Sequence, residues 1–316
     1  MFDFVGKRKT FFSISVALIV LVGVLTLVIG PKLDIQFKGG SIATYSYTGE
    51  LDKDQFEQVV EEQTQTKVTL QQQENTVTGQ KSLVVTLSSN EGMGTEEQAA
   101  LLDALQAAFP DNGISAEDVN NVDPVMGQEF LRKCVVAIVF ASVIMIVYIG
   151  FRFRKIGGTS AGVVAVIALL HDVVIAYGSF LICGFAINDN FIAVVLTILG
   201  YSINDTIVIY DRIRENERYE KNMPLPELVN KSINQCLRRT ITTSATTAAA
   251  LLSICVVAQM ANVTSIMTFA IPMMVGVLSG LYSSVFLSGP LWVWWQERKA
   301  QKAAQKAREE KFKKKA

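Results

Sequence analysis

Apolar residues gather in six long runs along the chain, and this pattern predicts six membrane-spanning helices. A helix needs about 20 residues to cross the hydrocarbon core of a bilayer, and the runs approach or exceed that length. The last run is long enough to bend at Pro272, where the ring removes a helical hydrogen bond. The runs are residues 11–29, 134–150, 161–182, 191–210, 240–259 and 264–295.

The segment between the first two runs has the patterns of a folded α+β domain. Its strands are predicted from alternating apolar and polar positions, and its helices from apolar positions three and four residues apart. The predicted strands are residues 42–47, 67–71, 82–87 and 114–122, and the predicted helices are residues 52–65 and 99–109. A capping box at Thr95–Gln98 precedes the second helix, and a turn is predicted at residues 75–80. The order β-α-β-β-α-β is typical of a ferredoxin-like domain.

The predicted fold class is therefore an α-helical polytopic membrane protein with one ferredoxin-like α+β domain outside the membrane. The expected division is a cytoplasmic N-terminus (1–10), a first transmembrane helix (11–30), the outer domain (31–130), transmembrane helices two to six (131–297) and a basic cytoplasmic tail (298–316).

Basic residues predict the orientation. Lys and Arg precede the first run and occupy the connections at 151–160 and 211–239, whereas the connections at 183–190 and 260–263 contain none. The positive-inside rule places both termini in the cytoplasm. Residues 31–129 hold 17 acidic residues, 5 lysines and no arginine, which suits an outer domain and argues against a nucleic-acid partner.

Asp205 lies inside the fourth apolar run, directly after Asn204. A lone carboxylate in a membrane helix costs about 2.5–3.5 kcal/mol on insertion scales, so it indicates a partner group or a task that needs the charge. Arg239 begins the fifth run, and its helical face continues through hydroxyl side chains such as Thr243. Two interpretations stay open: Asp205 and Arg239 form a fixed ion pair, or Asp205 carries a proton that Arg239 regulates.

His171 and Asp172 lie in the third run and provide a candidate second station for protons. Adjacent helical positions point in different directions, which weakens the case that they act together. Gly276 and Gly280 form a small-xxx-small row that predicts close packing against a helix of this chain or of another subunit.

Enzymatic chemistry and bound cofactors are not expected. The chain has a single histidine, and its four cysteines lie in or beside the apolar runs, so no metal spacing and no disulfide framework are visible. The outer segment shows no nucleophile with a base and no phosphate loop. The residues therefore predict no catalytic site, no cofactor and no metal, with protons as the coupling ion.

Four segments resemble the SecF family of bacterial protein export. The longest match is GYSINDTIVIYDRIRENE at residues 200–217, which is similar to the family signature of the fourth span. Residues 230–244, 168–176 and 32–41 resemble the family patterns of the fifth span, the third span and the segment after the first span. The resemblance covers the whole chain in order.

The resemblance implies a subunit that uses the proton gradient to promote preprotein translocation across the cytoplasmic membrane. The implied partners are SecD, the SecY–SecE–SecG channel, the translocating preprotein and membrane lipid. It ties the residues matching Asp205 and Arg239 to proton conduction. Gly39 and Gly40 match a tight turn, but Gln36 stands where the family has an aspartate, so any role of that carboxylate is in doubt.

Two alternatives remain. The SecF family is grouped with the resistance-nodulation-division transporters. A small-molecule or lipid exporter of that superfamily would use the same proton chemistry, although such chains usually have two six-span halves. A non-conducting scaffold of the export channel would need the helices and the outer domain but no titrating carboxylate.

Overall fold

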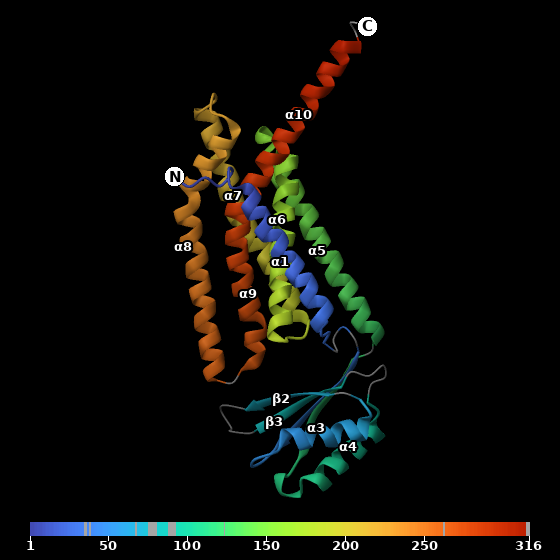
Figure 1. The fold of residues 1–316 in the computed structure, drawn as a ribbon. Coiled ribbons are helices and arrows are strands. Elements are labelled where there is room, and N and C mark those ends of the chain that lie inside the picture. The colour runs from blue at the N-terminus through green and yellow to red at the C-terminus, as the bar shows by residue number, and fades with distance from the viewer. Residues whose placement is uncertain are drawn as a thin grey trace.

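The computed structural model describes residues 1–34, 37, 39–66, 68–74, 81–87, 93–122, 124–261 and 263–313. In this part of the chain, six helices are long and apolar enough to cross a membrane. They form an elongated bundle with a small domain, here called the sheet domain (residues 39–122), at one end (Figure 1). Both chain termini lie at the opposite end of the bundle (Figure 1).

The helices follow the predicted runs and extend beyond them. They are α1 (Arg8–Ile29), α5 (Pro124–Arg152), α6 (Gly158–Cys183), α7 (Asp189–Tyr219), α8 (Leu225–Met260), and a last span made of α9 (Thr264–Tyr282), η3 (Ser283–Ser288) and α10 (Gly289–Lys313). α5 begins well before the apolar run at 134–150, and Glu129 and Lys133 form an ion pair one turn apart, 3.0 Å long, on its polar start. The apolar runs therefore mark only the part of each helix that can lie in the hydrocarbon core, and the helices continue beyond the runs as hydrogen-bonded turns.

The last span departs from α-helical geometry at a place that the sequence did not indicate. α9 continues through Pro272, where a bend was expected, and the departure is the π-helical segment η3. A π-helical turn inserts an extra residue and is frequent at functional sites.

Gly276 and Gly280 lie on α9 against α7 of the same chain. A Cβ atom at Gly276 would lie 2.1 Å from Ile198 Cδ1, and one at Gly280 would lie 3.0 Å from Ser202 Cβ. The two helices therefore approach each other closely where α9 has no side chain.

The sheet domain has the predicted element order: β1 (Gly40–Tyr47), α3 (Lys53–Thr64), β2 (Val68–Glu74), β3 (Lys81–Leu87), α4 (Thr95–Ala108), η1 (Pro110–Asn112) and β4 (Ser115–Val122). The strands form an antiparallel sheet in the order β2-β3-β1-β4. Alternate residues such as Tyr45 and its partner Leu83 are buried against Phe56 of α3 and Leu101 of α4. In Figure 1 the two helices lie on the side of the sheet away from the bundle. The turn predicted at 75–80 lies outside the described residues.

The start of α4 corrects the predicted capping box. The N-cap is Gly94 rather than Thr95, and its backbone N–H donates to the Glu97 side chain at 3.1 Å. Glycine has no side-chain acceptor, so only the Glu97 arm of the box is present.

The chain enters the sheet domain through a short connection that touches the bundle. Gly39 and Gly40 have φ angles of +84° and +142°, a region that favours glycine because it lacks a Cβ atom. Before them, Leu33 forms a parallel bridge with Ile187 of the α6–α7 loop, where Ile187 N–H donates to the Lys32 carbonyl at 2.7 Å. The connection between α1 and the sheet domain is thus joined to a loop of the bundle.

The close approach of α9 and α7 predicts that Gly276→Ala lowers the melting temperature in detergent. The added methyl group must displace the fully buried Ile198, and such overpacking typically costs about 1–3 kcal/mol. Gly200→Ala is the matched control, because a Cβ atom there meets nothing within 4 Å. Equal melting temperatures for the two variants would contradict the close packing.

Candidate functional site

Asp172 lies fully buried in the bundle and collects hydrogen bonds from three elements. Its Oδ2 accepts from Ser202 Oγ of α7 at 2.7 Å and from Ser283 Oγ of η3 at 2.6 Å. Its Oδ1 accepts from Ser279 Oγ of α9 at 2.6 Å. A carboxylate offers about four lone-pair sites, and three of them are filled here by hydroxyl donors. We call Asp172 with these three serines the serine cradle.

Further hydroxyl groups continue from the cradle along η3. Ser284 Oγ lies 3.0 Å from Thr206 Oγ1 and donates to the Ser202 carbonyl at 3.3 Å. One turn later, Ser288 Oγ donates to the Ser284 carbonyl at 2.8 Å. The π-helical turn therefore lies where consecutive serines face α6 and α7.

His171 contacts Asp172 despite being its neighbour in sequence. Its Nδ1 lies 3.2 Å from Asp172 Oδ1, so the expectation that the two side chains point apart was wrong. The other ring nitrogen, Nε2, is buried without a hydrogen-bond partner in the described part of the chain. The ring lies 5.9 Å from the ring of Tyr282, whose hydroxyl donates to the Phe11 carbonyl of α1 at 2.9 Å.

Asp205 is also buried, with 6% of its surface exposed, but it is poorly satisfied. Among the described residues its hydrogen-bond partner is Ser244 Oγ of α8, which lies 3.5 Å from Oδ2, at the limit of a hydrogen bond. Thr240 lies one turn before Ser244, and its buried Oγ1 has no partner among the described residues. The Asp205 carboxylate of α7 and the Thr240 hydroxyl of α8 can therefore each form further hydrogen bonds.

Arg239 is exposed on α8, and the ion pairs formed between described residues include none between it and Asp205. The fixed ion pair considered from the sequence is thus not formed in this state. Asn204 and Thr243 are exposed as well, although they lie within helices that can cross a membrane. Tyr201 Oη donates to the Thr243 carbonyl at 3.1 Å, which ties α7 to this face of α8.

The two carboxylates differ in what they can do chemically. The serine cradle supplies Asp172 with hydrogen-bond donors that are already in place. Asp205 holds one long contact, so it can accept a proton or a water molecule without breaking a network. The sequence treated both as stations of one relay, whereas the geometry suits an anchor at Asp172 and a titrating group at Asp205.

Sequence reasoning missed the cradle serines. Ser202 lies within the fourth-span motif, and Ser279 and Ser283 lie next to the row of small residues that was interpreted as packing alone. Their spacing of four residues on the last span was the available signal, because it places both hydroxyls on one helical face. The described residues contain no group of three His, Cys, Asp or Glu side chains that could hold a metal ion.

Comparisons with known proteins connect this geometry with protein export. Residues 102–298 match the family described as protein export membrane protein SecD/SecF, C-terminal. The chain is 33% identical over 296 residues to protein translocase subunit SecF of Endomicrobium trichonymphae, an alignment that covers 93% of this chain and 91% of that one.

Longer relatives and a solved structure contain a similar region as one part. The chain is 32% identical to protein translocase subunit SecDF of Bacillus subtilis over 302 residues, which cover 95% of this chain and 39% of that protein. The crystal structure of SecDF from Thermus thermophilus, described as a translocon-associated membrane protein, is similar with a TM-score of 0.76 at 29% identity. That match covers 94% of this chain and 39% of the solved one.

The serine cradle predicts that Ser279→Ala lowers the melting temperature, because the substitution leaves a buried carboxylate short of a donor. A hydrogen bond to a charged group is worth about 1.5–3 kcal/mol in water-soluble proteins and less between membrane helices. Ser253→Ala serves as the control, since Ser253 Oγ bonds only to the Ala249 carbonyl of its own helix at 2.9 Å. A drop in Ser253→Ala as large as that in Ser279→Ala would argue against the cradle.

Proposed function

Because the chain belongs to the SecF branch of the SecD/SecF family of protein export membrane proteins, we propose that it uses the proton gradient, together with SecD, to promote preprotein translocation. The family membership supports a role in protein export in a bacterial membrane. The proposed coupling to protons rests on one observation: Asp205 is buried between membrane helices, and its hydrogen bonding among the described residues is one 3.5 Å contact with Ser244. The proposed activity moves protons and polypeptide and makes or breaks no covalent bond.

In this proposal Asp205 takes up a proton in one state of the bundle and releases it in another. Arg239 lies on α8 one turn before Thr243, whose carbonyl accepts a hydrogen bond from α7. A displacement of α8 relative to α7 would change the distance between Arg239 and Asp205. A cation near a carboxylate favours the ionised form, so the approach of Arg239 would promote proton release. One proton crossing 100 mV supplies about 2.3 kcal/mol, enough to bias such a cycle.

The orientation in the membrane follows from the positions of the charges. Lys7, Arg8 and Lys9 lie at the end of the bundle that holds both termini, and the acidic sheet domain lies at the other end (Figure 1). We place the terminal end in the cytoplasm and the sheet domain outside, as the positive-inside rule requires.

SecD is the proposed membrane partner. The relatives named SecDF carry SecD and SecF in one chain, and this chain spans 39% of such a protein. Asn204, Arg239 and Thr243 are polar, lie in or next to the predicted apolar runs of α7 and α8, and are exposed in the single chain. Polar groups within a membrane need protein or water rather than lipid, so a second subunit covering this face would satisfy them.

The sheet domain is the proposed contact for the emerging preprotein, beside the SecY–SecE–SecG channel. Its strand order β2-β3-β1-β4, with two helices packed on the sheet, supports the proposal of a ferredoxin-like domain. β2 and β4 form the edges of this sheet, and an extended polypeptide can add to such an edge through main-chain hydrogen bonds. The domain would move with the bundle because the connection that leads to it from α1 is bridged to Ile187 through Leu33.

The serine cradle favours a second candidate, a non-conducting scaffold, since Asp172 is held by hydrogen bonds from serines on three segments. A small-molecule or lipid exporter is less well supported, because the chain has one six-helix bundle and one small domain. Asp205 distinguishes proton-driven translocation, here called the motor, from the scaffold. A scaffold would not require a buried carboxylate with so little hydrogen bonding.

Asp205→Asn should abolish the stimulation of preprotein translocation by a proton gradient in proteoliposomes containing the complete translocation machinery. The amide keeps the size and polarity of the side chain but cannot carry a proton. Translocation without a gradient should stay at the parent rate.

Asp211→Asn is the control for the loss of a carboxylate on the same helix. Asp211 lies two turns further along α7 in ion pairs with Arg152 and Arg214, and removing it should leave the gradient stimulation intact. Full stimulation in Asp205→Asn would refute the motor and favour the scaffold.

A further inference from the structure

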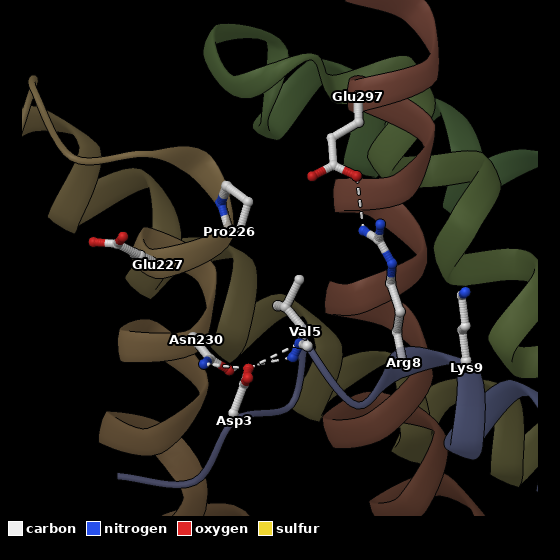
Figure 2. Close-up of a pocket in the computed structure, with 9 residues that line it drawn as sticks. Asp3, Val5, Arg8, Lys9, Pro226, Glu227, Asn230 and Glu297 are labelled. Atoms are coloured by element: carbon white, nitrogen blue, oxygen red, sulfur yellow. Dashed lines mark hydrogen bonds and ion pairs between the residues drawn. The ribbon is translucent and has the colours of Figure 1, made fainter.

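The first residues of the chain run along the start of α8 and are bound there by an asparagine side chain. Asn230 Oδ1 accepts hydrogen bonds from the backbone N–H groups of Phe4 at 2.7 Å and Val5 at 3.3 Å. Asn230 Nδ2 donates to Asp3 Oδ1 at 2.8 Å, and Figure 2 shows these groups facing one another. We call residues 2–6 the N-terminal strap.

A second asparagine repeats the contact one helical turn later. Asn234 Oδ1 accepts from the Phe2 N–H at 2.9 Å, and its Nδ2 donates to the Phe2 carbonyl at 2.8 Å. Residues four apart lie on one face of a helix, so Asn230 and Asn234 together bind the strap main chain much as a neighbouring strand would.

The other side of the strap is fixed to the last span. Phe4 is buried, and its ring lies 5.4 Å from the ring of Phe286 in η3, which also packs against Phe11 of α1 at 4.6 Å. Directly after the strap, Arg8 Nη1 bonds to Glu297 Oε2 of α10 at 2.8 Å (Figure 2). The strap therefore connects α8 to η3 and α10.

α8 has room to move on this side. A cavity of about 400 Å³ lies between the strap, the start of α8 and α10, lined by Asp3, Arg8, Glu227 and Glu297 among others (Figure 2). The start of α8 is attached to α7 as well, since Asn216 Nδ2 donates to Ser232 Oγ at 2.8 Å. α8 also packs along α9 of the last span, so the strap acts on the first turns of α8, which lie beside this cavity.

We propose that the N-terminal strap sets the position of α8 and thereby the separation of Arg239 from Asp205. Asn230 and Asn234 are positioning residues in this account, which rests on the proposed function of Asp205. Arg239 is five residues after Asn234, about 7 Å along the helix axis, so a displacement at the strap is transmitted rigidly to it.

The first test measures the position of α8 without reference to export. Spin labels are placed at exposed Glu227 of α8 and Gln301 of α10 in a full-length protein whose four cysteines are replaced by alanine. The double variant Asn230→Ala/Asn234→Ala should broaden the distance distribution beyond that of the parent. Asn222→Ala, an exposed asparagine in the α7–α8 connection, should leave it unchanged. An unchanged distribution in the double variant would overturn the proposal.

The second test separates positioning from simple stabilisation. In proteoliposomes, the pH of half-maximal gradient-driven export should shift in Asn230→Ala/Asn234→Ala and stay constant in Asn222→Ala. A contact that only stabilises the fold would reduce the amount of active protein and leave that pH unchanged, and this result would also overturn the proposal. If Asp205→Asn exports like the parent, the proposed function fails, while the distance measurement still decides whether the strap holds α8.

Discussion

The bundle depends on satisfying a carboxylate inside a low-dielectric interior. Asp172 is completely buried, and an unpaired charge there would cost several kcal/mol. The serine cradle supplies donors from α7, α9 and η3, so three segments must hold fixed positions around α6. The close approach of Gly280 to Ser202 belongs to the same arrangement, since it brings α9 near enough for Ser279 and Ser283 to reach Asp172.

This requirement makes α7 the link between two different carboxylates. Ser202 is fixed to Asp172, and Asp205, less than one turn further along, faces Ser244 of α8 with little to hold it. Asp205 therefore lies at the contact between α7, which is fixed to the serine cradle, and α8, which also packs along α9.

Much of the fold could be predicted because it follows from local patterns. Six apolar runs became six helices, and alternation in segments such as Gly40–Tyr47 became strands in the expected order. Asp205, Asp172 and His171 were found as candidates because a charge or imidazole in an apolar run is conspicuous. The contacts of Ser279 and Ser283 could not be predicted, because they depend on which helices pack together and on the π-helical turn that aims Ser283.

The exposure of Arg239 shows a different limit of sequence reasoning. Its spacing from the helical hydroxyls predicted a polar face on α8, and that face exists, but within this chain it is covered only in part. A guanidinium cannot remain against lipid at low cost, so the face must be completed by protein or water when the chain is in a membrane. The ion pair left open by the sequence is not formed among the described residues of this chain. The pattern of α7 and α8 alone could not determine this, because the distance between the two side chains depends on how the helices pack.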